Sequence, residues 1–277
     1  MTKRFYYLFI ALLMLTACKS YRYVYAPSPA INPFFTAKGD NQFALYYSGS
    51  GDNAEPGKRE KNEGLDIQGA YAISDRVALT GSYYYRTEQD FYPSSLTTQT
   101  VNFSTSTVNY KRKLFDIGAG YFIPLDKKKE FVFNLYGGIG FGDFAIADKG
   151  TDTNADPYTR NYKANMVKWY LQPSLNFFPA KHIRIGCISK FSFVSYNTVS
   201  TDYTTAEQSY FLLDKLPGKT IAFFEPGLNL QFSIPKAEWL KVESSFLAAI
   251  KWKENRPPHR SNNLSIGIAV SPFNIKK

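Results

Sequence analysis

His259 is one of only two histidines in this sequence, and Ser261 lies two positions after it. A serine activated by a histidine can attack an ester bond, which is the reaction of a lipid-modifying hydrolase. Residues so close in sequence rarely reach the geometry that proton transfer needs, and no acidic third member lies nearby. A lipid-modifying enzyme therefore stays an alternative. We expect a protein that is not an enzyme, with His259 as a solvated loop residue.

Ten charged residues form a second set that could carry chemistry, because each is predicted to point into a narrow interior. They are Asp66, Arg76, Arg86, Asp116, Lys168, Arg184, Lys190, Glu225, Lys241 and Glu243. Charges in such an interior must pair, since an unpaired buried charge costs several kcal/mol. We expect a structural network of ion pairs, with a conduction or proton path as the alternative. No cluster of histidine and cysteine suggests a metal site, and no cofactor is expected.

The strands that would hold these residues are clearest between Phe115 and Phe141. Bulky apolar side chains occupy every second position of two arms, opposite a face of glycines and small polar residues. Alternation with a period of two predicts strands. A bulky face opposite a glycine-rich one is typical of a membrane barrel with lipid outside and a tight polar interior. Each arm has about 9–11 residues, enough for a tilted strand to cross a bilayer.

The same alternation predicts about ten strands, at 42–48, 64–73, 76–87, 115–123, 131–141, 166–178, 182–193, 220–234, 239–249 and 263–271. Long polar segments, at 49–63, 88–107, 142–165, 194–219 and 251–262, alternate with short turns. Bacterial outer-membrane barrels have this arrangement, with the short turns on the periplasmic side. Pro173 and Pro226 fall inside predicted strands, so each should mark a bulge or bend. Inward aromatic residues, such as Tyr84 and Tyr136, predict a plugged or very narrow lumen.

Residues 1–17 are predicted to be a targeting segment rather than part of the fold. Lys3 and Arg4 precede a short apolar core, and Leu15-Thr16-Ala17-Cys18 follows it. This stretch resembles the lipobox of bacterial lipoproteins, which implies removal of a signal peptide and a covalent lipid on Cys18. The alternative is an ordinary signal peptide that happens to contain a cysteine.

Residues 18–40 are then expected to form a lipidated periplasmic tether, in which three prolines favour an extended chain. Lys19 follows the lipidated cysteine, where lipoproteins retained in the inner membrane often have aspartate. The resemblance therefore implies an anchor on the periplasmic side of the outer membrane. The barrel is expected to occupy residues 41–277.

Composition agrees with a membrane barrel. The chain has 277 residues, 17% aromatic side chains and a formal net charge of +10. The aromatic excess suits strands and membrane-interface belts, and the positive charges are spread over turns and loops. No basic helix or nucleic-acid motif occurs, so nucleic acid is not an expected partner. Cys187 has no disulfide partner if Cys18 is acylated, and it is expected to face lipid.

The chain from 41 to 271 resembles small outer-membrane β-barrel proteins of Gram-negative bacteria in its overall pattern. The resemblance implies an all-β, antiparallel, up-and-down transmembrane barrel in the outer membrane. We expect a non-catalytic outer-membrane lipoprotein, a structural or accessory subunit of an envelope complex that acts through its loops and tether. Its expected partners are outer-membrane lipids and other outer-membrane or periplasmic proteins. A small narrow pore and a lipid-anchored soluble β-sandwich are the alternatives.

Overall fold

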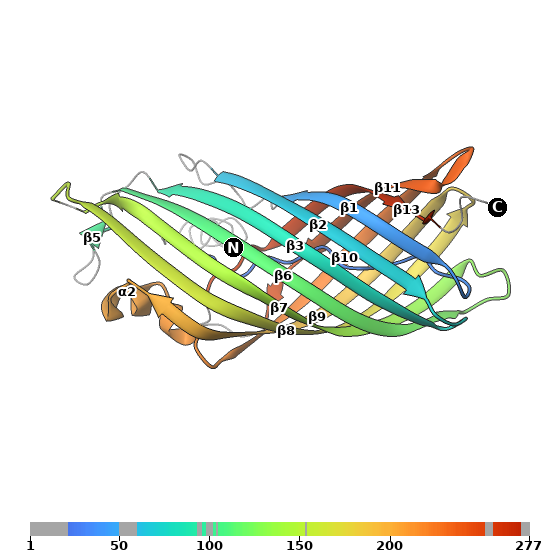
Figure 1. The fold of residues 1–277 in the computed structure, drawn as a ribbon, viewed down its shortest axis with the longest axis horizontal. Coiled ribbons are helices and arrows are strands. Elements are labelled where there is room, and N and C mark those ends of the chain that lie inside the picture. The colour runs from blue at the N-terminus through green and yellow to red at the C-terminus, as the bar shows by residue number, and fades with distance from the viewer. Residues whose placement is uncertain are drawn as a thin grey trace, which may run out of the picture.

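The computed structural model describes residues 22–49, 60–92, 96–97, 102–103, 105–152, 154–252 and 257–272. Ten long strands of this described chain form one antiparallel sheet that closes into a barrel (Figure 1). Strands adjacent in the chain are adjacent in the sheet, and the last strand pairs with the first. The predicted all-β, up-and-down barrel of about ten strands is confirmed.

The long strands are β1 (Asn41–Gly49), β2 (Glu60–Ala72), β3 (Val77–Tyr92), β6 (Thr105–Pro124), β7 (Phe131–Thr151), β8 (Pro157–Ala180), β9 (Ile183–Thr201), β10 (Thr220–Ile234), β11 (Ala237–Ala248) and β13 (Asn262–Val270). Three two-residue strands are β4 (Leu96–Thr97), β5 (Asn102–Phe103) and β12 (Ile250–Lys251). The connection between β9 and β10 holds α2 (Thr205–Tyr210) and η1 (Leu213–Lys215). Within the described residues, no helix has the length and apolar character needed to span a membrane.

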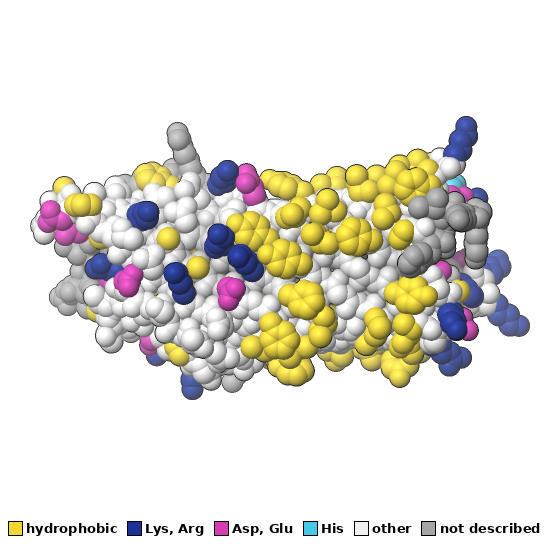
Figure 2. Space-filling model, in the orientation of Figure 1, with side chains coloured by type: hydrophobic (Ala, Val, Ile, Leu, Met, Phe, Trp, Pro, Cys, Tyr) yellow, Lys and Arg dark blue, Asp and Glu magenta, His cyan; other side chains and the backbone are white. Residues whose placement is uncertain are grey.

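Exposed apolar side chains form a belt on the part of the barrel nearest the short turns (Figure 2). On β6, the outward residues Phe115, Ile117 and Tyr121 are each about half exposed. Outward positions beyond them, towards the long connections, hold Lys111 and Lys113. Such a belt is what a lipid-facing surface requires. We call this part of the barrel the membrane half.

Glycines on the inner face of β6 and β7 leave room for large side chains. A Cβ added to Gly118 or Gly138 would lie 2.4 or 2.6 Å from the hydroxyl of Tyr170, which reaches across from β8. The glycine-rich face predicted from the sequence is therefore a packing surface inside the barrel. It lets the interior fill with side chains from neighbouring strands, as expected for a barrel of this size.

Several strands continue well past the belt, and we call this part the outer extension. β8 has 24 residues, whereas a tilted strand needs about 9–11 to cross a bilayer. The long loops predicted at 88–107, 142–165 and 194–219 are therefore partly wrong, because β3, β6, β7, β8 and β9 run into them. Here Val108, Phe144 and Met166 point inward and pack in a common core. The outer extension is thus stabilised by burial inside it rather than by lipid outside it.

Pro173 and Pro226 do not mark bulges, which were one of the two features expected at these prolines. β8 keeps the same register against β9 on both sides of Pro173, and Pro226 pairs with Ser189 in a continuous β9–β10 ladder. Pro226 lies between the residues of β10 that pair with β12 and those that pair with β11. Each missing N–H therefore coincides with a short gap in pairing on one side, and the register is unchanged.

Candidate functional site

The N-terminal part of the described chain lies inside the barrel. Residues 22–35, which we call the luminal segment, are buried except for the half-buried Tyr23. Side chains of β2, β6, β7, β8, β9 and β10 bond to it. The periplasmic tether expected at 18–40 is therefore wrong for residues 22–35. Their prolines favour an extended chain, as predicted, but the polar inner wall supplies partners for its backbone and draws it into the lumen.

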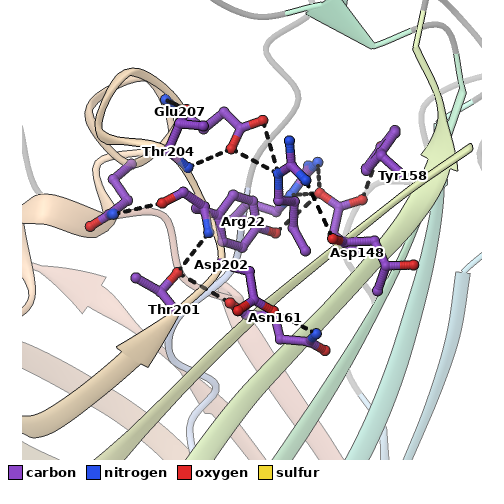
Figure 3. A network of polar contacts seen from close by, with 12 residues as sticks. Arg22, Asp148, Tyr158, Asn161, Thr201, Asp202, Thr204 and Glu207 are labelled. Atoms are coloured by element: carbon purple, nitrogen blue, oxygen red, sulfur yellow. Dashed lines mark hydrogen bonds and ion pairs between the residues drawn. The ribbon is translucent and has the colours of Figure 1, made fainter. Parts of the chain in front are cut away.

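At its outer end, the luminal segment is held by a buried ion pair between Arg22 and Asp148 of β7, with 2.5 Å between nitrogen and oxygen (Figure 3). The hydroxyls of Tyr158 and Tyr203 each donate to the same carboxylate at 3.1 Å. The ring of Phe211 lies 4.1 Å from the guanidinium carbon. Burial lowers the pKa of Arg22, but Asp148 together with the neighbouring tyrosines raises it by more. Burial raises the pKa of Tyr203 well above its usual value. Arg22 therefore stays charged and Tyr203 stays neutral at neutral pH.

The connection between β9 and β10 packs against this outer end. Leu213 and Leu216 are fully buried in the core that also contains Val24 of the luminal segment. Thr204 caps α2 through a reciprocal contact with Glu207, whose carboxylate accepts from Arg160 of β8 at 3.1 Å. These contacts fix the connection to the rim of the outer extension (Figure 3).

A second buried cluster joins three arginines to two carboxylates in the outer extension. Glu88 of β3 lies 2.7 Å from Arg86 and 2.9 Å from both Arg112 and Arg260. Arg260 also binds Asp90 at 2.6 Å. All five side chains are buried. Because Glu88 faces three cations from separate parts of the chain, it ties β3, β6 and the connection before β13 together.

The connection between β11 and β13 folds into the lumen against the luminal segment. The N–H of Val24 donates to the carbonyl of Pro258 at 2.9 Å, and the N–H of Arg260 donates to the carbonyl of Tyr25 at 2.8 Å. The hydroxyl of Tyr25 donates to Glu225 of β10 at 2.6 Å. This connection, expected to be a solvated outer loop, therefore forms part of the filling of the barrel between 257 and 260.

His259 is consequently half-buried, which corrects the expectation of a solvated loop histidine. Its ring centre lies 5.2 Å from that of Phe223, and its Nε2 lies 2.9 Å from the carbonyl oxygen of Ala249. A carbonyl oxygen can only accept, so Nε2 carries the proton. The backbone N–H of Ala249 donates to the carbonyl of Ser261 at 2.6 Å. No group of three or more His, Cys, Asp or Glu suited to a metal ion occurs within the described ranges.

Midway along the lumen, Ser28 of the luminal segment lies between two lysines. Lys168 approaches its hydroxyl to 3.2 Å and Lys190 to 3.5 Å. Lys168 forms an ion pair with Asp116 at 2.5 Å, and Lys190 lies 3.8 Å from Glu225. Residues predicted from the sequence as an interior charge network thus meet here, and the luminal segment passes between them.

Towards the turns, amide and hydroxyl groups replace the charges. Asn32 donates to Asn176 at 2.8 Å and accepts from Ser174 at 2.8 Å. Gly186 of β9 leaves the space that Asn32 occupies, because a Cβ there would lie 2.3 Å from its Nδ2. The fit between wall and segment is therefore close enough that one methyl group would disturb it.

Two phenylalanines end the luminal segment on the turn side. Phe34 packs edge-on against Phe178 and Phe35 against Phe122, with ring centres 5.9 and 6.1 Å apart. Beyond them a cavity of about 900 Å³ lies at the turn end of the barrel. Its lining has six basic side chains and three acidic ones, which are Lys128, Lys129, Lys181, Arg184, Lys236 and Lys241, and Asp40, Glu130 and Glu238.

The predicted interior charges are found largely where they were expected. Eight are buried: Asp66, Arg86, Asp116, Lys168, Lys190, Glu225, Lys241 and Glu243. Arg184 is half-buried and donates to Gln231 at 2.9 Å. Arg76 is exposed, which corrects its predicted inward position: β3 begins at Val77, so Arg76 belongs to the preceding turn.

Apart from Arg86, sequence reasoning missed the charges of the outer extension. Arg22, Asp148 and Arg260 lie in segments that were interpreted as tether and loops. One signal was present, because Arg86, Glu88 and Asp90 continue the inward spacing of β3 at every second position. No comparable signal placed Arg22, since its position depends on the whole segment entering the lumen.

Comparison with known structures gives the fold. The chain is similar to the translocator domain of the autotransporter NalP from Neisseria meningitidis, with a TM-score of 0.51, 9% identity, and coverage of 84% of this chain and 88% of that one. It is also similar to an outer-membrane channel from Pseudomonas putida F1, with a TM-score of 0.45, 10% identity, and coverage of 87% of this chain and 99% of that one. A third similar structure is the outer-membrane protease OmpT from Escherichia coli, with a TM-score of 0.41, 8% identity, and coverage of 84% of this chain and 94% of that one. No family model and no curated relative matches the chain. The likeness is one of fold: the chain has the fold of the outer-membrane β-barrels.

Proposed function

We propose that this protein is a non-catalytic outer-membrane lipoprotein, a barrel sealed by its own N-terminal segment that serves as a structural or accessory subunit of an envelope complex. The observation that carries the proposal is the occupation of the lumen by residues 22–35. The segment is bonded to the wall at its outer end, at its middle and near the turns. Because the luminal segment is bonded to the wall along its length, we expect the barrel to stay closed.

Displacing the luminal segment would be costly. Asp148 would lose its ion-pair partner Arg22, and Glu225 would lose the hydroxyl of Tyr25. Leaving a buried charge uncompensated costs about 3–5 kcal/mol. The surfaces that remain available for work are therefore the outer extension and the turn-side mouth, and both offer polar contacts to partner proteins (Figure 2). Residues 22–35 of the expected tether, which were expected to contribute contacts, lie instead inside the barrel.

The covalent lipid on Cys18, which lies outside the described residues, belongs to this proposal and rests on the lipobox resemblance of residues 15–18. Metabolic labelling with an alkyne fatty acid is expected to mark the native chain. The Cys18→Ser chain is expected to stay unmarked. Equal labelling of both chains would remove the lipoprotein part of the proposal and leave the sealed barrel standing.

The accessory role is tested by the native mass of the tagged protein, extracted from outer membranes in mild detergent. A mass well above protein plus micelle, with a second protein in stoichiometric amount, is expected. A lone barrel-sized particle would contradict the accessory role. Sealing is tested separately in planar bilayers, where the intact protein is expected to give no conductance steps.

A small narrow pore is the second candidate, and the basic cavity of about 900 Å³ at the turn end favours it. That cavity would serve as the vestibule of a channel whose gate is the luminal segment. Anion-selective steps from the intact protein, reduced when Arg184 is replaced by Gln, would favour the pore over the sealed barrel.

A further inference from the structure

The cavity of about 900 Å³ lies at the turn end of the barrel, which is on the right of Figure 1. Phe34 and Phe35 of the luminal segment line its inner end, where they pack against Phe178 and Phe122. Outer-membrane barrels have their short turns on the periplasmic side, so the cavity opens towards the periplasm. Its size lies within the range of sites that bind small molecules.

The three acidic side chains of the cavity either have partners of their own or lie at its rim. Asp40 accepts from two backbone N–H groups of the turn before it, at 2.7 and 3.0 Å. Glu238 forms an exposed ion pair with Lys181 at 2.7 Å. Glu130 is exposed, next to the turn between β6 and β7. These carboxylates therefore leave the cations deeper in the cavity without a counter-charge.

Two of those cations belong to the inner wall of the barrel. Lys241 of β11 is only 6% exposed, and its ammonium donates to the hydroxyl of Ser271 at 2.7 Å. Arg184 of β9 is half-buried and donates to the side-chain oxygen of Gln231 at 2.9 Å. In the part of the chain that the structure describes, neither cation forms an ion pair. Both are held by neutral acceptors and line the same cavity.

The buried carboxylate nearest in sequence to Lys241 does not supply the missing charge. Glu243 accepts from Gln42 at 3.0 Å and also from the hydroxyl of Tyr46 and the amide of Gln231. Its oxygens are thus occupied by neutral donors. A buried cation without a compensating charge is unfavourable, so an anion that entered the cavity would stabilise both Arg184 and Lys241.

The two cations are close enough to hold one ligand. β9 and β11 both pair with β10, so their backbones lie about 10 Å apart, at about 4.8 Å between neighbouring strands. Guanidinium and ammonium groups form charge-assisted hydrogen bonds with carboxylate and phosphate oxygens. Phe178 and Trp239 also line the cavity and offer aromatic surface to the rest of a ligand.

We propose that this cavity binds a small organic oxyanion, whose carboxylate or phosphate group lies between Arg184 and Lys241 and whose apolar part contacts Phe178 and Trp239. The ligand is a soluble molecule rather than a membrane lipid, because both cations line the inside of the barrel. This site goes beyond the structural or accessory role. It depends neither on a lipid on the chain nor on a partner protein.

Isothermal titration calorimetry of the full-length protein in a nonionic detergent tests the site, with a titration into empty micelles subtracted. Phenyl phosphate and benzoate are the probes for the two oxyanions, and phenol is the neutral probe of similar shape. At least one of the two anions is expected to bind with a Kd below about 1 mM, and phenol at least about tenfold more weakly. Comparison of the two anions shows whether the site prefers phosphate or carboxylate.

Substitutions separate the two inner cations from the general positive charge of the rim. Arg184→Gln and Lys241→Met should each weaken binding of the anion at least about tenfold, because each removes a charge-assisted hydrogen bond. Lys128→Gln is the matched control, since Lys128 is an exposed cation at the rim and its loss should change the affinity by less than about twofold. Arg184→Lys keeps the charge and should bind within about fivefold of the native chain.

Absence of binding by both anions would overturn the proposal, and so would equal binding of phenol. Anion binding that survives either Arg184→Gln or Lys241→Met would also overturn it. Arg184→Lys guards against a folding defect, and a loss there as complete as in Arg184→Gln would contradict binding through charge. The native mass keeps this outcome apart from the proposed function. A lone particle that binds the anion loses the accessory role and keeps the site, and a complex that binds no anion does the reverse.

Discussion

The outer extension has the larger buried apolar core and the membrane half has the larger exposed apolar surface, although the same strands build both. In the outer extension the interior holds apolar and aromatic residues such as Val108, Phe144 and Ile146. In the membrane half it holds amides and hydroxyls such as Gln172, Ser174 and Asn176. The outside is reversed, because an apolar belt surrounds only the membrane half. The outer extension is therefore built like a water-soluble protein, and the membrane half is built like one turned inside out.

This difference follows from the solvent on each side of the wall. Water surrounds the outer extension, so apolar side chains gain by moving inside. Lipid surrounds the membrane half, so apolar side chains lose nothing by facing outward, and the polar ones meet across the lumen. The luminal segment matches both environments, with Val24 in the apolar core and Asn32 among the amides. Substitutions placed in one part or the other should therefore differ in cost.

The largest effect is expected from breaking the buried cluster in the outer extension. Arg260→Met removes the buried cation that binds Asp90 and one of the three that face Glu88, and should lower the free energy of unfolding by about 3–5 kcal/mol. Arg160→Met is the control, because its ion pair with Glu207 is partly exposed and should contribute at most about 1 kcal/mol. Urea unfolding in detergent or liposomes measures both. Similar losses for the two variants would contradict a buried cluster.

Two phenylalanines on one strand compare the two environments directly. Phe144, 1% exposed inside the outer extension, should cost about 3–5 kcal/mol when replaced by Ala. Phe141, 50% exposed on the lipid face, should cost roughly half as much or less, because lipid fills the space that the shorter side chain leaves and no internal cavity forms. The free energies of unfolding of the two variants, measured in liposomes, show which substitution costs more. A greater loss at Phe141 would mean that the apolar core of the outer extension contributes little.

A lysine placed on the outer wall should distinguish lipid from water. Ile117→Lys lies within the belt and should cost about 2–4 kcal/mol, as charges do near the bilayer midplane. Thr107→Lys lies on the same face of β6 in the outer extension and should change stability by less than about 0.5 kcal/mol. The ratio of the two losses locates the membrane edge. Equal losses of stability for the two variants would mean that Ile117 does not face lipid.

The smallest loss of stability in this series is expected from a larger side chain that presses against the luminal segment. Gly186→Val pushes on Asn32 and should cost about 1–3 kcal/mol through overpacking. Gly69→Val is the control, because nothing lies within 4 Å of a Cβ added there. Protease sensitivity near residues 22–35 should rise for Gly186→Val only. No change at either glycine would argue against a closely fitted segment.

Much of the membrane half was predictable from the sequence, and most of the outer extension was not. Phe115 to Ile123 and Phe131 to Phe141 have apolar residues at odd positions, and they lie in strands with those residues outward, as predicted. Beyond residue 142 the apolar residues move to even positions, with Phe144 and Ile146 inward. A search for one continuous alternating pattern ends each strand at this change of phase. The shift from odd to even positions marks the point where lipid outside the barrel gives way to water. In the sequence alone, the same shift also resembles the start of a polar loop.

The sequence by itself determined the closed antiparallel sheet, the lipid-facing side chains and the inward direction of charges such as Lys168 and Glu225. Those features depend on the period of two within a strand, which is a local property of the chain. Only the tertiary structure decided that residues 22–35 fill the lumen and that Arg22 meets Asp148. An extended, proline-containing segment has the same sequence pattern whether it lies in solvent or inside a barrel. Its place is set by polar groups that six different strands bring together, and no local pattern in the segment records them.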